Sequence, residues 1–337
     1  MSVVNVAIVG ATGLVGQTFI RVLEERGFPI KQLKLLASER SIGKRLNAFG
    51  HDIPVEQATP QSFKGVDIAL FSAGAGVSRI LAPEAAKAGA VVVDNSSAWR
   101  MDPQVPLVVP EVNPEDIAWN KGIIANPNCS TIQMVVALNP LHKRNPILRI
   151  IADTYQSASG AGGRALQEMK EQTADVIAGK MPNLRAFPHQ IAFNALPQID
   201  VFEEGDYTKE EWKMVRETRK IMHAPEIAVS ATCVRIPVAF SHSEAVHAEF
   251  TDPITPQQAR DILSKAPGVV VMDDPASKKY PMAIHAEGRD EVFVGRIRKD
   301  LAFANGLSLW VVADNIRKGA ATNAVQIAEL LAKNGKR

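Results

Sequence analysis

Residues 3–16 read V-V-N-V-A-I-V-G-A-T-G-L-V-G, and this stretch decides the fold class. The apolar, β-branched run from Val3 to Val9 predicts a strand, and Gly10 to Gly16 predicts a tight turn that opens into a helix. Glycines in such a turn let the backbone approach a pyrophosphate, which binds at the helix N-terminus. The spacing is G-x-x-G-x-x-G rather than G-x-G-x-x-G, so a turn without a ligand is the alternative. We favour a dinucleotide site.

Further apolar runs alternate with helical patterns up to about residue 127. They are Leu33–Ala37, Val66–Ser72, Val91–Asp94, Val105–Val109 and Gly122–Ala125. This alternation predicts an α/β domain with a Rossmann-type, doubly wound parallel sheet that is covered on both faces.

The pattern changes after this domain, and strands and helices no longer alternate. We therefore predict a second, α+β domain at 128–315 for catalysis and dimerisation, and a nucleotide-binding domain at 1–127. A helical pattern follows Asn315, and we expect this last segment, 316–337, to pack back on the first domain.

The composition excludes several classes of function. The chain has 337 residues and a net charge of +2 that is spread along it, which argues against nucleic-acid or membrane-surface binding. Two cysteines make no disulfide framework and favour a cytoplasmic setting. The N-terminus lacks the pattern of a signal peptide, and no apolar run is long enough to span a membrane.

The residues after the second predicted strand bear on the choice of dinucleotide. Ser38, Arg40 and Ser41 can donate to a 2′-phosphate, whereas Glu39 is the discordant residue. We therefore favour NADP over NAD. The stretch S-A-G-A-G, which contains Ser72 and Gly74, follows the third strand and lines either the cofactor or an ordinary βα loop.

Cys129, in N-P-N-C-S-T-I-Q, lies where a turn signal meets a helical apolar pattern that we expect Pro140 to end. The helix dipole and the first amide groups favour a thiolate there and lower the thiol pKa. A buried cysteine that only fills space is the commoner case, but the dinucleotide domain immediately before Cys129 favours a nucleophile. Cys233 lies within an apolar strand, and we interpret it as a core residue.

His242 is the preferred proton partner for such a thiol. It lies at a polar break between two predicted strands. His247 lies five residues further on, and an odd separation along a strand puts the two rings on opposite faces. We therefore expect no shared metal, and no other cluster has the spacing of a zinc site.

Several charged residues are candidate anchors for a substrate. Arg235 stands on an otherwise apolar strand, where it must hold either a structural or a substrate carboxylate. Arg100 follows the fourth strand, at the sheet end where ligands bind. Glu210 and Lys213 are three residues apart on one predicted helix, so they form either one side of a pocket or a solvated surface pair.

Taken together, the sequence closely resembles the aspartate-β-semialdehyde dehydrogenase family, of the bacterial kind. The resemblance covers about residues 4–330. It rests on these motifs, in this order: G-A-T-G-L-V-G, S-A-G-A-G, V-V-D-N-S-S-A-W-R-M-D, V-P-E-V-N, N-P-N-C-S-T-I-Q, T-Y-Q-S-A-S-G-A-G, N-A-L-P-Q-I-D, R-I-P-V-x-x-x-H-S-E and V-G-R-I-R-K-D.

The resemblance implies an NADPH-dependent oxidoreductase that converts L-4-aspartyl phosphate into L-aspartate 4-semialdehyde and phosphate, reversibly and through a cysteine thioester. This is a step of amino-acid biosynthesis, toward lysine and diaminopimelate, threonine, methionine and isoleucine. It also implies a homodimer or a tetramer of dimers, built through the second domain, and no metal.

The resemblance further implies roles for individual residues. Cys129 is the nucleophile, His242 the general acid/base, and Gln156 orients the substrate. Arg235 and Glu210 bind the carboxylate and the amino group of the substrate. Arg100 and Lys213 bind its phosphate, with Asn128 nearby. The cofactor residues are Gly10, Thr12, Gly13, Leu14, Val15, Ser38, Arg40, Ser41, Ser72, Gly74, Ser159, Gly160, Gly162 and Asn315.

Two alternatives remain at this point. One is a related acyl-phosphate reductase, such as N-acetyl-glutamyl-phosphate reductase, although an N-acetylated substrate offers no charged amine to Glu210. The other is a non-catalytic NADP-binding redox sensor. Residues 164–192 match the family only loosely, and we expect this region to affect subunit packing or cofactor closure.

Overall fold

The computed structural model describes residues 1–333 and divides into two compact units. The first unit contains Met1–Asn128 and the C-terminal segment from Ala320, and the second contains Cys129–Gly319. The predicted C-terminal segment extends to residue 337, and its positions 334–337 lie outside the described residues. Across residues 1–333, no helix combines the length and the apolar character that a membrane span requires.

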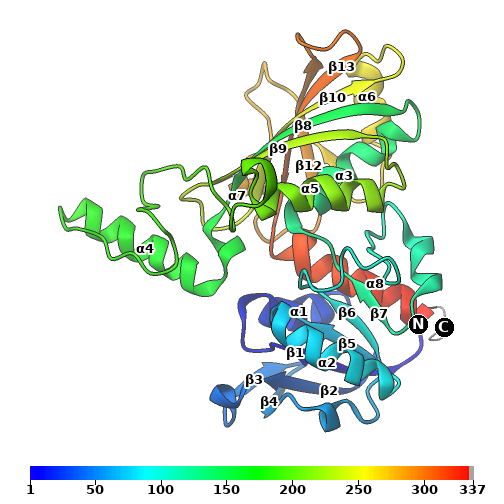
Figure 1. The fold of residues 1–337 in the computed structure, drawn as a ribbon, viewed down its shortest axis with the longest axis vertical. Coiled ribbons are helices and arrows are strands. Elements are labelled where there is room, and N and C mark those ends of the chain that lie inside the picture. Colours follow the sequence, from blue (N-terminus) through cyan, green and yellow to red (C-terminus); the bar gives the residue numbers. More distant parts are fainter. Residues whose placement is uncertain (334–337) are drawn as a thin grey trace. The chain divides into compact units, whose positions relative to one another are not determined.

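The first unit is built on a seven-stranded sheet with the order β3-β4-β2-β1-β5-β6-β7 (Figure 1). All neighbouring strands are parallel except for the β3–β4 pair. The strand order reverses at β1, so the loops after β1 and β5 flank the switch point where ligands of such sheets bind. Its elements are β1 (Val4–Val9), α1 (Leu14–Glu25), β2 (Ile30–Ala37), η1 (Glu39–Ser41), β3 (Arg45–Ala48), β4 (His51–Gln57), η2 (Pro60–Phe63), β5 (Ile68–Phe71), α2 (Ala75–Lys87), β6 (Val91–Asp94), η3 (Pro114–Trp119), β7 (Ile123–Ala125) and α8 (Thr322–Lys333).

Helices cover both faces of this sheet, which explains why its central strands β1, β5 and β6 are largely apolar. On one face, α1 and α8 lie against each other and share a core with the sheet, to which α8 contributes Val325, Ile327 and Leu331 (Figure 1). On the other face, α2 contributes Leu81 and Ala85 to a second core. The C-terminal helix is therefore a structural part of the first unit.

Buried amides connect α8 to the end of β7. The Asn323 side chain donates from Nδ2 to Asn126 Oδ1 over 2.7 Å and to the Val108 carbonyl over 2.9 Å. Asn126 in turn donates from Nδ2 to Asn95 Oδ1 over 2.7 Å. Both Asn126 and Asn323 are fully buried, so these bonds satisfy amide groups that water does not reach.

The second unit contains a six-stranded, mixed sheet with the order β11-β12-β13-β10-β8-β9. Helix α3 lies across one face, with α5 and α6 beside it. Figure 1 shows α4 standing apart from this sheet. The elements are α3 (Cys129–His142), β8 (Ile147–Gln156), η4 (Ala158–Ala161), α4 (Gly163–Ile177), η5 (Glu204–Asp206), α5 (Lys209–Ile221), β9 (Ala228–Arg235), β10 (His242–Phe250), α6 (Pro256–Leu263), β11 (Val269–Val271), α7 (Ala283–Ala286), β12 (Val292–Lys299), β13 (Gly306–Ala313) and η6 (Arg317–Ala321).

The predicted fold class is confirmed, with three local corrections. Residues 45–57 form the β3–β4 hairpin, which the sequence analysis did not identify. Val105–Val109 is not a strand, because only Leu107 makes a bridge, to Ala125. Pro140 does not end α3, which continues to His142. This helix is buried on almost every side, so packing outweighs the cost of about 3 kcal/mol for an internal proline.

Gly10→Ala tests how tightly the β1–α1 turn is packed. Gly10 has a φ of +87°, and an added Cβ would lie 2.3 Å from the Ser72 carbonyl oxygen. Gly89 has a φ of +93° but no atom within 4 Å of an added Cβ, so Gly89→Ala is the matched control. We expect Gly10→Ala to lower the free energy of unfolding by about 1–3 kcal/mol more than Gly89→Ala does, in chemical denaturation followed by circular dichroism. Equal losses in the two variants would contradict the close approach.

Candidate active site

The loop after β1 has the form of an anion-binding turn. Gly10 closes against the backbone of Ser72, which follows β5, and only a residue without a Cβ fits there. Gly13 is the N-cap of α1 and makes no side-chain cap, and no acidic residue occupies the first turn. Leu14 and Val15 begin that helix, so their amide groups belong to its N-terminus. These features fit a cofactor pyrophosphate.

The predicted 2′-phosphate residues lie in and next to η1, immediately after β2. Ser41 Oγ lies 3.3 Å from Oγ1 of Thr12 in the glycine loop, so the two segments meet. Ser38, Glu39 and Arg40 are exposed, and Ser41 is buried. Hydroxyl groups and a guanidinium beside the glycine loop suit a phosphate-bearing ribose.

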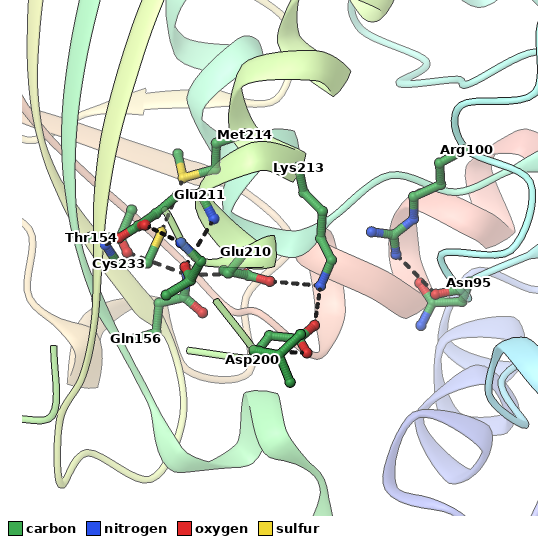
Figure 2. Close-up of polar contacts among 12 residues, drawn as sticks. Asn95, Arg100, Thr154, Gln156, Asp200, Glu210, Glu211, Lys213, Met214 and Cys233 are labelled. Carbon is green, nitrogen blue, oxygen red and sulfur yellow. Dashed lines mark hydrogen bonds and ion pairs between the residues drawn. The ribbon is translucent and has the colours of Figure 1, made fainter. Parts of the chain in front are cut away.

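Two predicted substrate residues, Arg100 and Asn128, belong to the first unit, and both are buried. Arg100 donates from Nε to the Asn126 carbonyl over 3.0 Å and from Nη2 to the Asn95 carbonyl over 3.1 Å; Figure 2 shows the latter bond. Asp94 lies near this guanidinium, and burial raises the pKa of its carboxyl group, although Ser96 and Arg100 act in the opposite direction. The backbone thus holds the Arg100 guanidinium in one orientation.

Cys129 is the first residue of α3 and is partly exposed. Its backbone lies against Gly319, where an added Cβ would be 2.8 Å from the cysteine Cβ and 3.3 Å from its Cα. The predicted position of this thiol at a helix start therefore agrees with the structure. Cys233 is a fully buried residue of β9, and burial raises the pKa of its thiol, which agrees with a core role.

The pair Glu210 and Lys213 is not a solvated surface pair. Glu210 is 5% exposed, its Oε2 accepts from Lys213 Nζ over 3.0 Å, and its Oε1 accepts from Gln156 Nε2 over 3.2 Å. Lys213 Nζ also lies 3.1 Å from Oδ2 of Asp200 (Figure 2). The structure thus brings three predicted residues, from β8 and α5, into one polar cluster.

Arg235 and His242 lie at the end of β9 and the start of β10, and both are buried. Arg235 donates from Nη1 to the Ser157 carbonyl over 2.7 Å. An added Cβ at Gly160 would lie 2.8 Å from Arg235 Nη1 and 3.2 Å from His242 Nε2, so this glycine lets the loop close on both side chains.

Burial shifts the pKa values of the Arg235 and His242 side chains. It lowers the pKa of Arg235, while the negative charges of Glu210 and of a Cys129 thiolate oppose that shift. Burial, followed by the positive charge of Arg235, lowers the pKa of His242 to about 3. The imidazole is therefore neutral at physiological pH.

The hydroxyl and amide residues that were predicted for the nicotinamide side form a buried network. Asn315 donates from Nδ2 to Ser159 Oγ over 3.0 Å, and its Oδ1 accepts from the Ser241 amide over 2.9 Å. Ser157 Oγ donates to the same Oδ1 over 3.1 Å. Gly162 has a φ of +92° and is the N-cap residue of α4. This network fixes the loop that follows β8.

Sequence reasoning missed two residues of this site. Ser157 donates its backbone amide to His242 Nδ1 over 3.0 Å, and its position directly after Gln156 was the available signal. Asp200, the second carboxylate at Lys213, lies in an irregular segment, and its place at the end of the motif N-A-L-P-Q-I-D was the available signal. His242 and His247 face opposite sides of β10, as predicted, and His247 instead contacts Asp300. Within residues 1–333, no group of three or more His, Cys, Asp or Glu residues is arranged to hold a metal.

Comparisons with known proteins agree with both units. Residues 5–120 match the family description "Semialdehyde dehydrogenase, NAD binding domain", and residues 138–318 match "Semialdehyde dehydrogenase, dimerisation domain". The aspartate-semialdehyde dehydrogenase of Aquifex aeolicus is 64% identical over 335 residues, which cover 98% of each chain.

Solved structures give the same result. The crystal structure of aspartate semialdehyde dehydrogenase II of Vibrio cholerae complexed with ASA has a TM-score of 0.97 and 51% identity, and the match covers 99% of each chain. The aspartate semialdehyde dehydrogenase of Candida albicans, solved with NADP, has a TM-score of 0.77 and 28% identity, and again 99% of each chain is covered. The chain belongs to the semialdehyde dehydrogenase family, as an oxidoreductase of the aspartate-semialdehyde dehydrogenase type with a nicotinamide-binding domain.

Proposed function

We propose that this chain reduces L-4-aspartyl phosphate with NADPH to L-aspartate 4-semialdehyde and phosphate, reversibly, through a thioester on Cys129. The observation that carries the proposal is that one unit holds a thiol at a helix start, a neutral imidazole and a buried pair of opposite charges. In metabolism this reaction serves the synthesis of lysine and diaminopimelate, threonine, methionine and isoleucine, and we propose a cytoplasmic location.

Arg235 and Glu210 form a clamp for a zwitterionic amino acid. The guanidinium binds the α-carboxylate, and the carboxylate binds the α-ammonium group. Gln156 donates to Glu210 and thereby orients both the carboxylate and the substrate. Because both charged groups are buried, their interactions with a bound substrate are screened little by water. An N-acetylated substrate offers no charged amine to Glu210, which argues against the related acyl-phosphate reductase.

Cys129 supplies the nucleophile. The N-terminus of α3 favours its thiolate, which attacks the acyl carbon and expels phosphate to form a thioester. Arg100, Lys213 and Asn128 bind the phosphate group and stabilise the charge that develops on it. The nicotinamide cofactor, when bound, supplies the hydride that reduces the thioester. Cys129 then leaves as a thiolate, which releases the aldehyde.

His242 holds its proton at a defined nitrogen. The Ser157 amide N–H donates to Nδ1, so the neutral ring carries its hydrogen on Nε2, which can donate to the substrate oxygen. Ser157 Oγ also lies 3.1 Å from the same Nδ1. The hydrogen on Nε2 can therefore be given to the substrate oxygen as the thiohemiacetal forms and taken back as it collapses.

The predicted cofactor residues fall into groups with separate roles. Gly10, Thr12, Gly13, Leu14 and Val15 would hold the pyrophosphate, and Ser72 and Gly74 would line the neighbouring loop. Ser38, Arg40 and Ser41 would bind the 2′-phosphate of NADP. Ser159, Gly160, Gly162 and Asn315 would contact the nicotinamide half. We propose a homodimer assembled through the second unit, the region that matches a dimerisation domain.

A phosphate-dependent assay tests the function. We expect the wild-type protein to reduce NADP when L-aspartate 4-semialdehyde and phosphate are both present, and to be inactive with the N-acetylated glutamate analogue. Cys129→Ser should lose at least 1,000-fold in kcat, on the order of 4 kcal/mol, because a hydroxyl is a far weaker nucleophile. Cys233→Ser is the matched control and should keep most of the activity. Full activity in Cys129→Ser would contradict the proposal.

The neutral imidazole of His242 predicts how stability depends on pH. Above its ordinary pKa of about 6.5 the residue is neutral in both states and has no effect. Below that pH the unfolded chain binds a proton that the folded chain excludes down to about pH 3, so the free energy of unfolding falls by about 1.4 kcal/mol per pH unit. His242→Asn should remove this contribution and give a shallower decline in denaturant titrations between pH 6.5 and 5. Parallel declines would argue against a neutral buried ring.

Arg40 tests the preference for NADP. Its guanidinium is expected to pair with the 2′-phosphate, so Arg40→Ala should raise the KM for NADP about 10- to 100-fold and leave the KM for NAD within about twofold. Glu39→Gln is the control, because it changes a neighbouring charge without removing the phosphate donor. An equal change for both cofactors would show that Arg40 does not read the 2′-phosphate.

A further inference from the structure

Glu244 is a buried carboxyl group that the mechanism does not use. It lies on β10 two residues after His242, so both side chains face α3. It is 0% exposed, and neither Oε1 nor Oε2 has a hydrogen-bond partner. An ionised carboxylate in such a place would carry a desolvation cost of several kcal/mol with nothing to offset it.

The charged and titratable groups around Glu244 also disfavour its ionisation. Burial raises the pKa of its carboxyl group well above the usual range; the Gln133 side chain acts in the opposite direction, and the Glu210 carboxylate on α5 raises it further. The Cys233 thiol on β9 interacts with Glu244, and His242 on β10 is neutral. Glu210 has Lys213 as its cation, whereas Glu244 makes no ion pair. Of the two neighbouring carboxyl groups, Glu210 is thus the one that carries the charge.

Gln133 supplies the second, independent observation. It lies on α3 one turn after Cys129 and is 0% exposed. Its Nε2 donates to the His242 carbonyl over 3.3 Å and to the Val311 carbonyl over 3.5 Å, while its Oε1 has no partner. Gln133 lies against Glu244. The acceptor Gln133 Oε1, which has no donor, is therefore next to the Glu244 carboxyl group, which has no hydrogen-bond partner.

A single proton on Glu244 would give both Glu244 and Gln133 Oε1 a hydrogen-bond partner. If Glu244 is protonated, its O–H can donate to Gln133 Oε1. The same amide group donates from Nε2 to the two strand carbonyls. The opposite orientation of the Gln133 amide would direct Oε1 at two carbonyl oxygens, which is repulsive. With Nε2 directed at the two carbonyls, Oε1 is left to accept, and a protonated Glu244 can supply the donor.

We propose that Glu244 is a neutral carboxylic acid in the folded protein and that, by donating to Gln133, it positions the first turn of α3 against the backbone of His242. Glu244 is therefore a positioning residue. It acts through Gln133 on the two residues that the proposed function assigns to nucleophilic attack and proton transfer, and in this sense the inference rests on that function.

Infrared spectroscopy of the full-length protein tests the protonation state. The difference spectrum between wild type and Glu244→Gln at neutral pH should contain the carbonyl band of one protonated carboxylic acid, which only the wild type contributes. A difference in carboxylate bands instead would overturn the proposal. This measurement uses no substrate, so its result is independent of whether the phosphate-dependent assay succeeds.

Kinetics test the positioning role. In Glu244→Gln the side-chain amide can still donate to Gln133, so kcat and its pH profile should stay within about twofold of wild type. Glu244→Met keeps the size but removes the donor, and kcat should fall about tenfold while the KM for the semialdehyde is unchanged. Gln133→Met should lose a similar factor, and the double variant should lose no more than either single one.

Other kinetic outcomes would overturn the role. A shifted pH profile in Glu244→Gln would mean that the ionised form is the working one. Unchanged kcat in Glu244→Met, or losses that multiply in the double variant, would mean that the two residues do not act through one contact. If Glu244→Met does not fold, the infrared band and the kinetics of Glu244→Gln decide the question.

Discussion

The hydrogen bonds of the buried residue Asn126 are the interactions on which the first unit depends at the carboxyl end of its parallel strands, where ligands of such sheets bind. Its backbone amide donates to the Asp94 carbonyl over 2.8 Å, and its side chain joins Asn95 to Asn323 of α8. Its carbonyl oxygen accepts from Arg100 Nε over 3.0 Å. Asn126 lies three residues before Cys129. The same buried group thus orients the candidate phosphate-binding arginine and fixes the strand end from which the chain enters α3.

The second unit keeps its buried ionisable groups in different charge states. Glu210 is paired with Lys213, Arg235 is held by a backbone carbonyl, and burial keeps His242 neutral. Such differences arise because each group has its own balance of desolvation and partners. A site that binds an amino acid, releases phosphate and transfers a proton needs both charged and neutral groups. The sheet of the second unit, together with α3 and α5, carries both kinds.

Much of this could be predicted from the sequence, because the decisive signals are local. The glycine turn after a strand and the thiol at the start of an apolar helix are both patterns of neighbouring residues. The β3–β4 hairpin escaped prediction since its residues are mostly polar, as is common at a sheet edge. The burial of Glu210 and the contact of Lys213 with Asp200 depend on how distant segments pack, which no spacing reveals. The prediction that Pro140 ends the helix was wrong because burial of α3 outweighs the low helix propensity of proline.

The discontinuity of the first unit has a consequence for how the chain is made. Residues up to Asn128 leave the ribosome first, and roughly 190 more are added before α8, which takes roughly 10–40 s at ordinary elongation rates. Until then the sheet face that packs against Val325, Ile327 and Leu331 has no cover. The second unit, whose residues are continuous, can fold meanwhile. The unit that is begun first is therefore completed last, and it exposes an apolar face until α8 has been made.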